Sequence, residues 1–280
     1  MRILTFFIIS ISIFAQKTYF WQMNDIEINH KIIKISKNKS FNNKIIKYSW
    51  LFTKTPYKLN ILGEGNIKPL YSFKGVDCVT YVETVLALAN SNTLDKSISL
   101  LQKIRYKNGE IKYNKRNHFT MTQWIPNNES LGIIKNITDK VSKNTKIMIK
   151  DITQKSFNGK FKKFKSLKEN LPLGKHSIKY IPIKYFLNNY NNMNIPNGTI
   201  MLIIRENKNN YPIFTTHLGF IVKNNKNELI FRSAVTNRKY KEVRDYKLIS
   251  YLRFYTDYFS KKNWGIKGIS LYLPQELNDN

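Results

Sequence analysis

Cys78 is the residue whose type and surroundings best suit a nucleophile. It is the only cysteine among the 280 residues, so the chain has no internal disulfide. It follows Asp77, a residue type that caps helices, and opens an apolar run that ends in strong helix formers. This pattern predicts a helix over residues 78–90 with the thiol in its first turn. Unpaired backbone N–H groups and the helix dipole stabilise a thiolate there, so we expect a lowered cysteine pKa.

A lone cysteine also has a plainer interpretation, because many are small buried hydrophobic side chains. Residues 1–15 argue against it, since one arginine, an apolar core and a small residue before Gln16 form the pattern of a cleaved secretory signal. An exported protein normally uses its cysteines in pairs, and one left over indicates a reactive thiol or an intermolecular partner. We therefore expect a periplasmic or extracellular protein with no membrane span after signal cleavage.

Residues 77–84, Asp-Cys-Val-Thr-Tyr-Val-Glu-Thr, resemble the nucleophile motif of a known family. This family is the N-acetylmuramoyl-L-alanine amidase-like branch of the NlpC-type cell-wall cysteine hydrolases. The resemblance extends, with gaps, from about residue 55 to about residue 237. It implies a papain-like α+β fold, in which a helix-borne cysteine packs on an antiparallel sheet that carries a histidine. It also implies hydrolysis of an amide bond, with no metal or cofactor.

The resemblance identifies a base and a third residue. His217 stands in a His-x-Gly pattern similar to that of the family's base, and Gly219 leaves one face of its strand open beside the imidazole. The third residue orients the histidine and fixes its tautomer. The family often has histidine there, whereas the matching position here is Ser233, with Asn237 as the alternative. An uncharged hydroxyl is expected to orient the ring more than it stabilises an imidazolium.

Two substrate contacts are implied in residues 55–65, which resemble a Pro-Tyr…Leu-Gly-Glu-Gly segment at the border of the family's active site. By this resemblance Tyr57 donates its hydroxyl towards an oxyanion, and Glu64 contacts the substrate. Core packing remains the alternative for Tyr57, and a solvent-exposed turn the alternative for Glu64.

Three more contacts are implied by a segment similar to the family's groove loop, which contains Arg116, His118 and Trp124. Gln123 stands where the family usually has an aspartate. His118 is the rival of His217 as the base, and contact with a sugar or packing within the loop are its other interpretations.

The elements that position these residues follow from the apolar pattern. Three apolar runs joined by polar turns, at residues 199–205, 215–222 and 228–234, predict an antiparallel meander. Helices are expected within residues 20–49, 78–90, 94–106 and 248–259, and a closing strand at residues 264–273. We predict a signal peptide at residues 1–15 and one domain over residues 16–280, with an insertion at about 130–195.

The formal net charge is +29. The lysines are spread along the whole chain, without an arginine-rich arm or a known nucleic-acid motif, so we do not expect a nucleic-acid partner. Lysine, asparagine and isoleucine are abundant together, as AT-rich coding DNA would produce. Attraction to an anionic cell wall is an expected consequence of this charge.

The resemblance implies a secreted amidase that cleaves the bond between N-acetylmuramic acid and L-alanine in peptidoglycan or muropeptides. The residues alone indicate only acyl transfer at an amide. An endopeptidase that cuts between D-glutamate and the diamino acid, and a non-catalytic basic wall-binding protein, are the alternatives. A zinc amidase is disfavoured, because the four histidines are scattered and form no His-Glu-x-x-His run.

Overall fold

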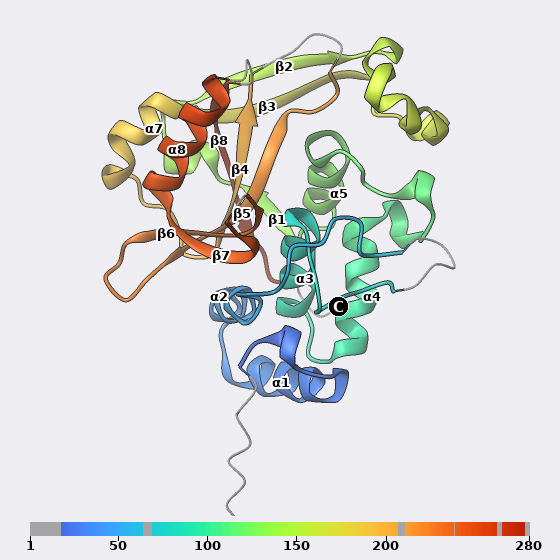
Figure 1. The fold of residues 1–280 in the computed structure, drawn as a ribbon, viewed down its shortest axis with the longest axis vertical. Helices are drawn as coiled ribbons and strands as arrows, with labels where there is room; N and C mark the ends of the chain where they lie inside the picture. Colours follow the sequence, from blue (N-terminus) through green and yellow to red (C-terminus); the bar gives the residue numbers. More distant parts are fainter. Residues whose placement is uncertain (1–17, 64–68, 207–210, 238, 262–264, 278–280) are drawn as a thin grey trace, which may run out of the picture.

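The computed structural model describes residues 18–63, 69–206, 211–237, 239–261 and 265–277. It has an α+β fold built around an antiparallel sheet, as the sequence predicted. Helices α1 to α5 lie on one side of this sheet, and α7 and α8 lie on the other (Figure 1). The predicted signal peptide and Glu64 fall outside the described residues.

The helical side contains α1 (Asp25–Asn38), α2 (Phe41–Leu51), α3 (Cys78–Ala89), α4 (Leu94–Arg105) and α5 (Ile125–Ser130). The predicted amphipathic helices within residues 20–49 are therefore confirmed as α1 and α2. Helix α3 begins where predicted, because the Asp77 carboxylate accepts hydrogen bonds from the backbone N–H groups of Val79 and Thr80. Every α3 residue from Thr80 to Ala89 is buried, and α3 packs against α2, α4 and strand β5.

The sheet has the order β2-β3-β8-β4-β5-β6-β7, and β1 pairs with β8. All of these pairings are antiparallel. The strands are β1 (Ile134–Asn136), β2 (Lys146–Ile152), β3 (Gly174–Pro182), β4 (Thr199–Arg205), β5 (Thr215–Lys223), β6 (Leu229–Thr236), β7 (Lys241–Lys247) and β8 (Ile266–Pro274). The meander of three strands predicted from the apolar runs corresponds to β4, β5 and β6.

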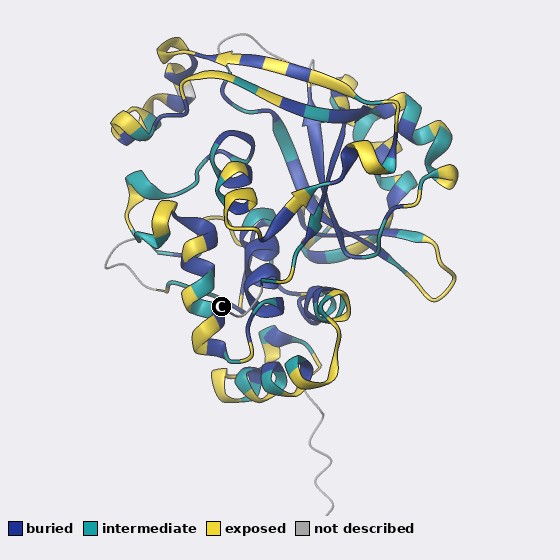
Figure 2. Ribbon diagram, turned by 180° about the vertical axis from the view of Figure 1, so that it is seen from behind, coloured by how far each residue is buried: buried dark blue, intermediate teal, exposed yellow. Residues whose placement is uncertain are grey.

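The central strands are apolar on both faces because each face has a cover of helices. Along β4, Ile200, Leu202 and Ile204 pack into the core that includes α3. The alternating residues Met201 and Ile203 pack into a second core with α7 (Ile183–Asn189) and α8 (Leu248–Ser260). Every residue of β4 is buried, whereas much of the β2–β3 hairpin is exposed (Figure 2).

The predicted insertion contributes strands β1, β2 and β3 to the same sheet, together with α6 (Thr138–Val141) and α7. Between β2 and β3 the chain forms an arm of 3₁₀ turns, η5 (Gln154–Phe157) and η6 (Gly159–Asn170). Phe164 of this arm packs against Phe119, with ring centroids 4.9 Å apart. The arm therefore reaches back to the helical side of the molecule.

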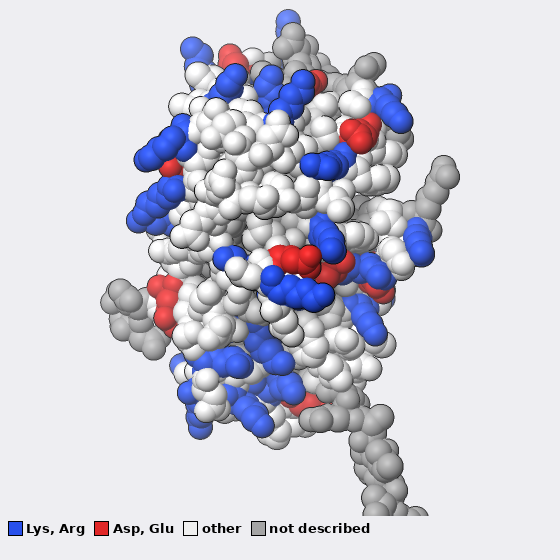
Figure 3. All heavy atoms as spheres, turned by 90° about the vertical axis from the view of Figure 1, so that its left-hand side faces the viewer, with Lys and Arg blue, Asp and Glu red and all other residues white. Residues whose placement is uncertain are grey.

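On the side shown in Figure 3, Lys and Arg side chains are scattered over the upper part and the flanks and gather at the lower end of the molecule. Asp and Glu side chains lie between some of them (Figure 3). Among the described helices, none is both long and apolar enough to cross a membrane.

Candidate active site

Cys78 lies at the N-terminus of α3 and lines two cavities. One cavity, of about 170 Å³, is shared with His217 and Leu218 on β5. The other, of about 590 Å³, is shared with Tyr57 and Arg116. The thiol is half-buried. A substrate with its reacting bond at Cys78 would therefore have room in both cavities.

His217 is held by a hydrogen-bond chain that defines its tautomer. Its Nε2 lies 2.9 Å from Ser233 Oγ, and that hydroxyl donates to the Leu218 carbonyl at 2.6 Å. Because the hydroxyl proton is used in this way, Ser233 Oγ accepts from Nε2–H of the ring. The neutral imidazole then has Nδ1 as its proton acceptor.

Gly219 brings the two strands close enough for this contact. A Cβ atom at residue 219 would lie 2.6 Å from both Ser233 Cβ and the Arg232 carbonyl oxygen. The face of β5 beside His217 is therefore filled by β6, rather than left open as the sequence suggested. Glycine is needed at this position because β6 approaches the backbone of β5.

Burial opposes charge on both members of the Cys78–His217 pair. Burial, with the Asp77 carboxylate nearby, raises the pKa of the Cys78 thiol to about 12, although the backbone N–H groups of Leu218, Cys78 and Val79 act to lower it. Burial lowers the pKa of His217 to about 4. The expected low cysteine pKa is therefore wrong, because desolvation outweighs the helix N-terminus. At neutral pH the two groups are a thiol and a neutral imidazole.

The buried imidazole predicts a loss of stability in acid. His217 binds a proton near pH 4 in the folded protein but near pH 6.5 when unfolded. Between these values the unfolded state holds more protons, so the free energy of unfolding should fall by about 3 kcal/mol as the pH decreases from 6.5 to 4. Urea unfolding of the wild type and of His217→Gln at several pH values measures this term. Equal pH slopes for the two proteins would contradict it.

Tyr57 reaches the site because its segment is held along the sheet edge. The Tyr57 backbone N–H donates to the Lys241 carbonyl at 2.8 Å, and Lys58 donates to Val76 at 3.0 Å. These bonds connect residues 54–58 to β7 and to the turn that precedes α3. Burial, together with negative charge at Cys78, raises the pKa of Tyr57 to about 12. The phenol therefore keeps its proton at neutral pH and can donate a hydrogen bond.

His118 and Arg116 also border the cavities at Cys78. His118 lines both of them, and Arg116 lines the larger. The His118 ring donates from Nε2 to the Tyr113 carbonyl at 2.7 Å, and its centroid lies 5.4 Å from that of Phe164. The structure thus brings both candidate bases to the thiol cavity. Ser233 orients only His217, whereas the Tyr113 carbonyl and the rings of Tyr113 and Phe164 hold His118.

Trp124 lies in the core, away from the cavities at Cys78. Its side chain is fully buried, and its indole N–H donates to Glu83 Oε1 at 3.0 Å. Arg105 Nη1 lies 3.2 Å from the other Glu83 oxygen, so the carboxylate joins α3, α4 and the turn before α5. The implied sugar contact of Trp124 is therefore not present in this structure. The large aromatic side chain supports the helices beneath the site.

Asn237, the alternative third residue, lies away from the imidazole. Its side chain lies 3.4 Å from the Tyr246 hydroxyl and accepts from the backbone N–H groups of Lys239 and Tyr240. These contacts close the turn between β6 and β7. Ser233 is the one of the two candidates that touches His217.

Two aromatic residues of the site were not identified from the sequence. Tyr251 and Tyr255 on α8 each place their ring centroid 6.3 Å from that of His217, and the two tyrosines stack at 5.2 Å. Both are close enough to Cys78 that negative charge on its sulfur raises their pKa, in addition to the effect of burial. The sequence does contain a sign of this pair, because a spacing of four residues places both tyrosines on one face of the helix predicted at residues 248–259.

The described residues contain no group of three or more His, Cys, Asp or Glu side chains that could hold a metal ion. The chemistry that the site can perform with its own residues is that of a thiol, an imidazole and a phenol.

Comparison with known proteins gives one family match and several similar structures. The family model AmiA-like, described as N-acetylmuramoyl-L-alanine amidase-like, matches residues 47–256. Protein LPG0564 from Legionella pneumophila is 29% identical with a TM-score of 0.73, and covers 90% of this chain and 98% of its own. An N-acetylmuramoyl-L-alanine amidase from Bacteroides uniformis is 22% identical with a TM-score of 0.62, and covers 84% of this chain and 99% of its own. At this identity the likeness supports the fold alone. No curated protein sequence matches the chain.

Proposed function

The chain belongs to the AmiA-like, N-acetylmuramoyl-L-alanine amidase-like family, and on that premise we propose that it is a cysteine amidase that cleaves the bond between N-acetylmuramic acid and L-alanine. The observation that carries the mechanism is the cavity shared by Cys78 and His217, with Ser233 bonded to the far ring nitrogen. This arrangement matches the division of roles in papain-like hydrolases of the NlpC type, in which a helix-borne thiol and a strand-borne imidazole work together.

In the proposed first step, Cys78 Sγ attacks the amide carbonyl carbon while its proton passes to Nδ1 of His217. The tetrahedral intermediate collapses when the C–N bond breaks, and the imidazolium gives its proton to the leaving amine. Water then attacks the thioester, with His217 again acting as the base. The neutral pair supports transfer of the proton during attack, rather than a thiolate formed beforehand.

Two hydrogen-bond donors are proposed for the oxyanion. The first is the backbone N–H of Cys78 at the N-terminus of α3, where the helix dipole favours negative charge. The second is the Tyr57 hydroxyl, which borders the larger cavity and keeps its proton at neutral pH. Ser233 acts through His217 and is a positioning residue.

Product analysis tests the choice of bond. A disaccharide-peptide incubated with the protein should release a peptide with a free L-alanine amino terminus, identified by mass spectrometry. The same peptide without its sugar should remain essentially uncut, because binding energy from the muramoyl group is used to orient the amide. Efficient cleavage of the sugar-free peptide between D-glutamate and the diamino acid would contradict this assignment and indicate the endopeptidase.

We also propose that the protein acts outside the cytoplasm. The basis for this proposal is the signal-like composition of residues 1–15, together with the proposed peptidoglycan substrate. Fractionation of cells that express the full chain, with N-terminal sequencing of the exported protein, tests the proposal. Retention of the whole chain in the cytoplasm would overturn it.

A further inference from the structure

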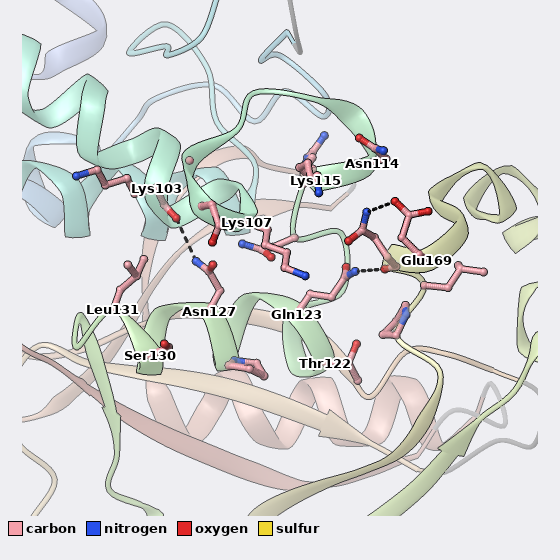
Figure 4. A pocket seen from close by; sticks show the side chains of 18 residues that line it. Lys103, Lys107, Asn114, Lys115, Thr122, Gln123, Asn127, Ser130, Leu131 and Glu169 are labelled. Carbon is pink, nitrogen blue, oxygen red and sulfur yellow. Dashed lines mark hydrogen bonds between the residues drawn. The ribbon is translucent and has the colours of Figure 1, made fainter.

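A second large cavity lies outside the proposed catalytic groups. It has a volume of about 720 Å³ and lies between the C-terminal end of α4, the segment from η2 (Lys107–Gly109) to α5, and the end of the η6 arm (Figure 4). None of Cys78, His217, Ser233 or Tyr57 lines it. Its wall combines lysine, arginine, asparagine and glutamine side chains with apolar ones from Pro126, Leu131, Leu171 and Pro172.

This cavity is basic. Lys107, Lys115 and Arg116 line it from two separate turns, and Lys103 contributes from α4. Among the lining residues, Glu169 is the only acid. Within the described part of the chain no acidic partner is found for Lys107 or Lys115. The cavity would therefore attract an anionic ligand more strongly than a neutral one.

The wall is fixed by hydrogen bonds to backbone groups. Gln123 donates to the Asn170 carbonyl at 2.8 Å, which ties the end of the η6 arm to the π-helical turn η4 (Thr120–Trp124) (Figure 4). Asn127 donates to the Lys103 carbonyl at 3.1 Å, which ties α5 to α4 (Figure 4). The shape of the cavity is thus set before any ligand arrives, which lowers the entropic cost of binding.

One side chain in this wall has an unused polar group. Thr122 is nine-tenths buried and lines the cavity, yet its hydroxyl has no hydrogen-bond partner among the described residues. The hydroxyl oxygen itself is closed off from solvent, so it lies beneath the cavity wall and does not face a ligand.

The cavity is adjacent to the one at Cys78. Arg116 and Asn117 line both cavities. Asn117 is anchored by its backbone N–H to the Arg105 carbonyl at 2.9 Å and by its side chain to the Ile104 carbonyl. A chain-like ligand with its reacting amide at Cys78 can therefore continue across a fixed wall into the basic cavity.

We propose that the basic cavity is a second subsite, which binds the carboxylate-bearing end of the peptide attached to the reacting amide. This inference rests on the proposed function for its ligand class. A muropeptide carries free carboxylates along the peptide beyond L-alanine, whereas its sugars carry hydroxyl and amide groups. Lysine and arginine side chains with neighbouring amides recognise carboxylates by charge-assisted hydrogen bonds. The subsite would select for substrates with a longer, anionic peptide.

The test compares two substrates in three proteins. The short substrate is N-acetylmuramoyl-L-alanine with an amidated C-terminus, and the long one is the N-acetylmuramoyl tetrapeptide with its carboxylates free. Lys107→Gln/Lys115→Gln should lower kcat/KM for the long substrate about fivefold, which corresponds to about 1 kcal/mol, and leave the short substrate unchanged. Lys34→Gln/Lys37→Gln on exposed α1 positions is the charge-matched control and should change neither. An equal loss of kcat/KM for the long substrate in the control variant, or no loss in either variant, would overturn the proposed subsite.

A binding measurement keeps this proposal distinct from the proposed function. If the wild type hydrolyses neither substrate, the proposed function fails. Titration calorimetry with the sugar-free tetrapeptide then decides on the cavity alone, with a fivefold weaker Kd expected for Lys107→Gln/Lys115→Gln and no change for the control. Stronger competition by a glycerol phosphate polymer than by the tetrapeptide would assign the cavity to a phosphate ligand and overturn the peptide assignment.

Discussion

Replacement of Cys78 by alanine or serine is expected to abolish amide hydrolysis while the protein remains folded. Loss of a nucleophile from a catalytic pair lowers kcat by about 10⁴-fold or more, and a serine hydroxyl at the same place is a far weaker nucleophile than a thiol. The substitution removes only a small, half-buried side chain, so the unfolding temperature should change little. Hydrolysis of a muropeptide and thermal unfolding of both variants measure the two effects.

The controls for Cys78 address the mechanism. Thiol alkylation should inactivate the wild type, and treatment with EDTA should not. Activity that is lost in EDTA and restored by zinc would show that the thiol is not the nucleophile. Activity retained by Cys78→Ala would show the same. A protein that binds muropeptides but is inert before and after alkylation would be the wall-binding alternative.

The core of the fold could be predicted because its signals are local. The three apolar runs of the meander and the capped helix at Cys78 are largely buried, and their apolar patterns indicate this burial directly. Strand β7 was not predicted, because only Val243 among its residues is buried and charged side chains occupy most of the others. An edge strand is defined by its neighbour rather than by its own composition.

The site could be predicted only in part, for a related reason. The sequence indicates which residues have suitable chemistry, but burial decides what they do. Trp124 has the right type for a sugar contact and lies instead in the core, bonded to Glu83. Desolvation reverses the expected shift in the cysteine pKa, and it depends on the packing of β5 and α8 around the thiol rather than on α3 itself. Tyr251 and Tyr255 reach His217 from a helix more than thirty residues away in the chain.

Replacement of His217 by alanine is the second large effect that we expect. A positioned general base contributes about 10² to 10⁴-fold to the rate, so kcat for muropeptide hydrolysis should fall by that factor. His118→Ala, the matched variant of the other histidine at the thiol cavity, should reduce kcat less, because no side chain like Ser233 orients its ring towards catalysis. The opposite order of the two variants would make His118 the base.

The pH profile of the wild type then distinguishes a neutral pair from an ion pair. The acidic limb of kcat/KM should fall near pH 4, where His217 takes up a proton and can no longer act as a base. No alkaline limb should appear below about pH 9, because burial raises the pKa of the Cys78 thiol to about 12. Ser233→Ala should move the acidic limb, since the hydroxyl that accepts from Nε2–H is removed. A decline of activity near pH 8, with rapid alkylation of the free enzyme at pH 6, would instead require a thiolate–imidazolium pair.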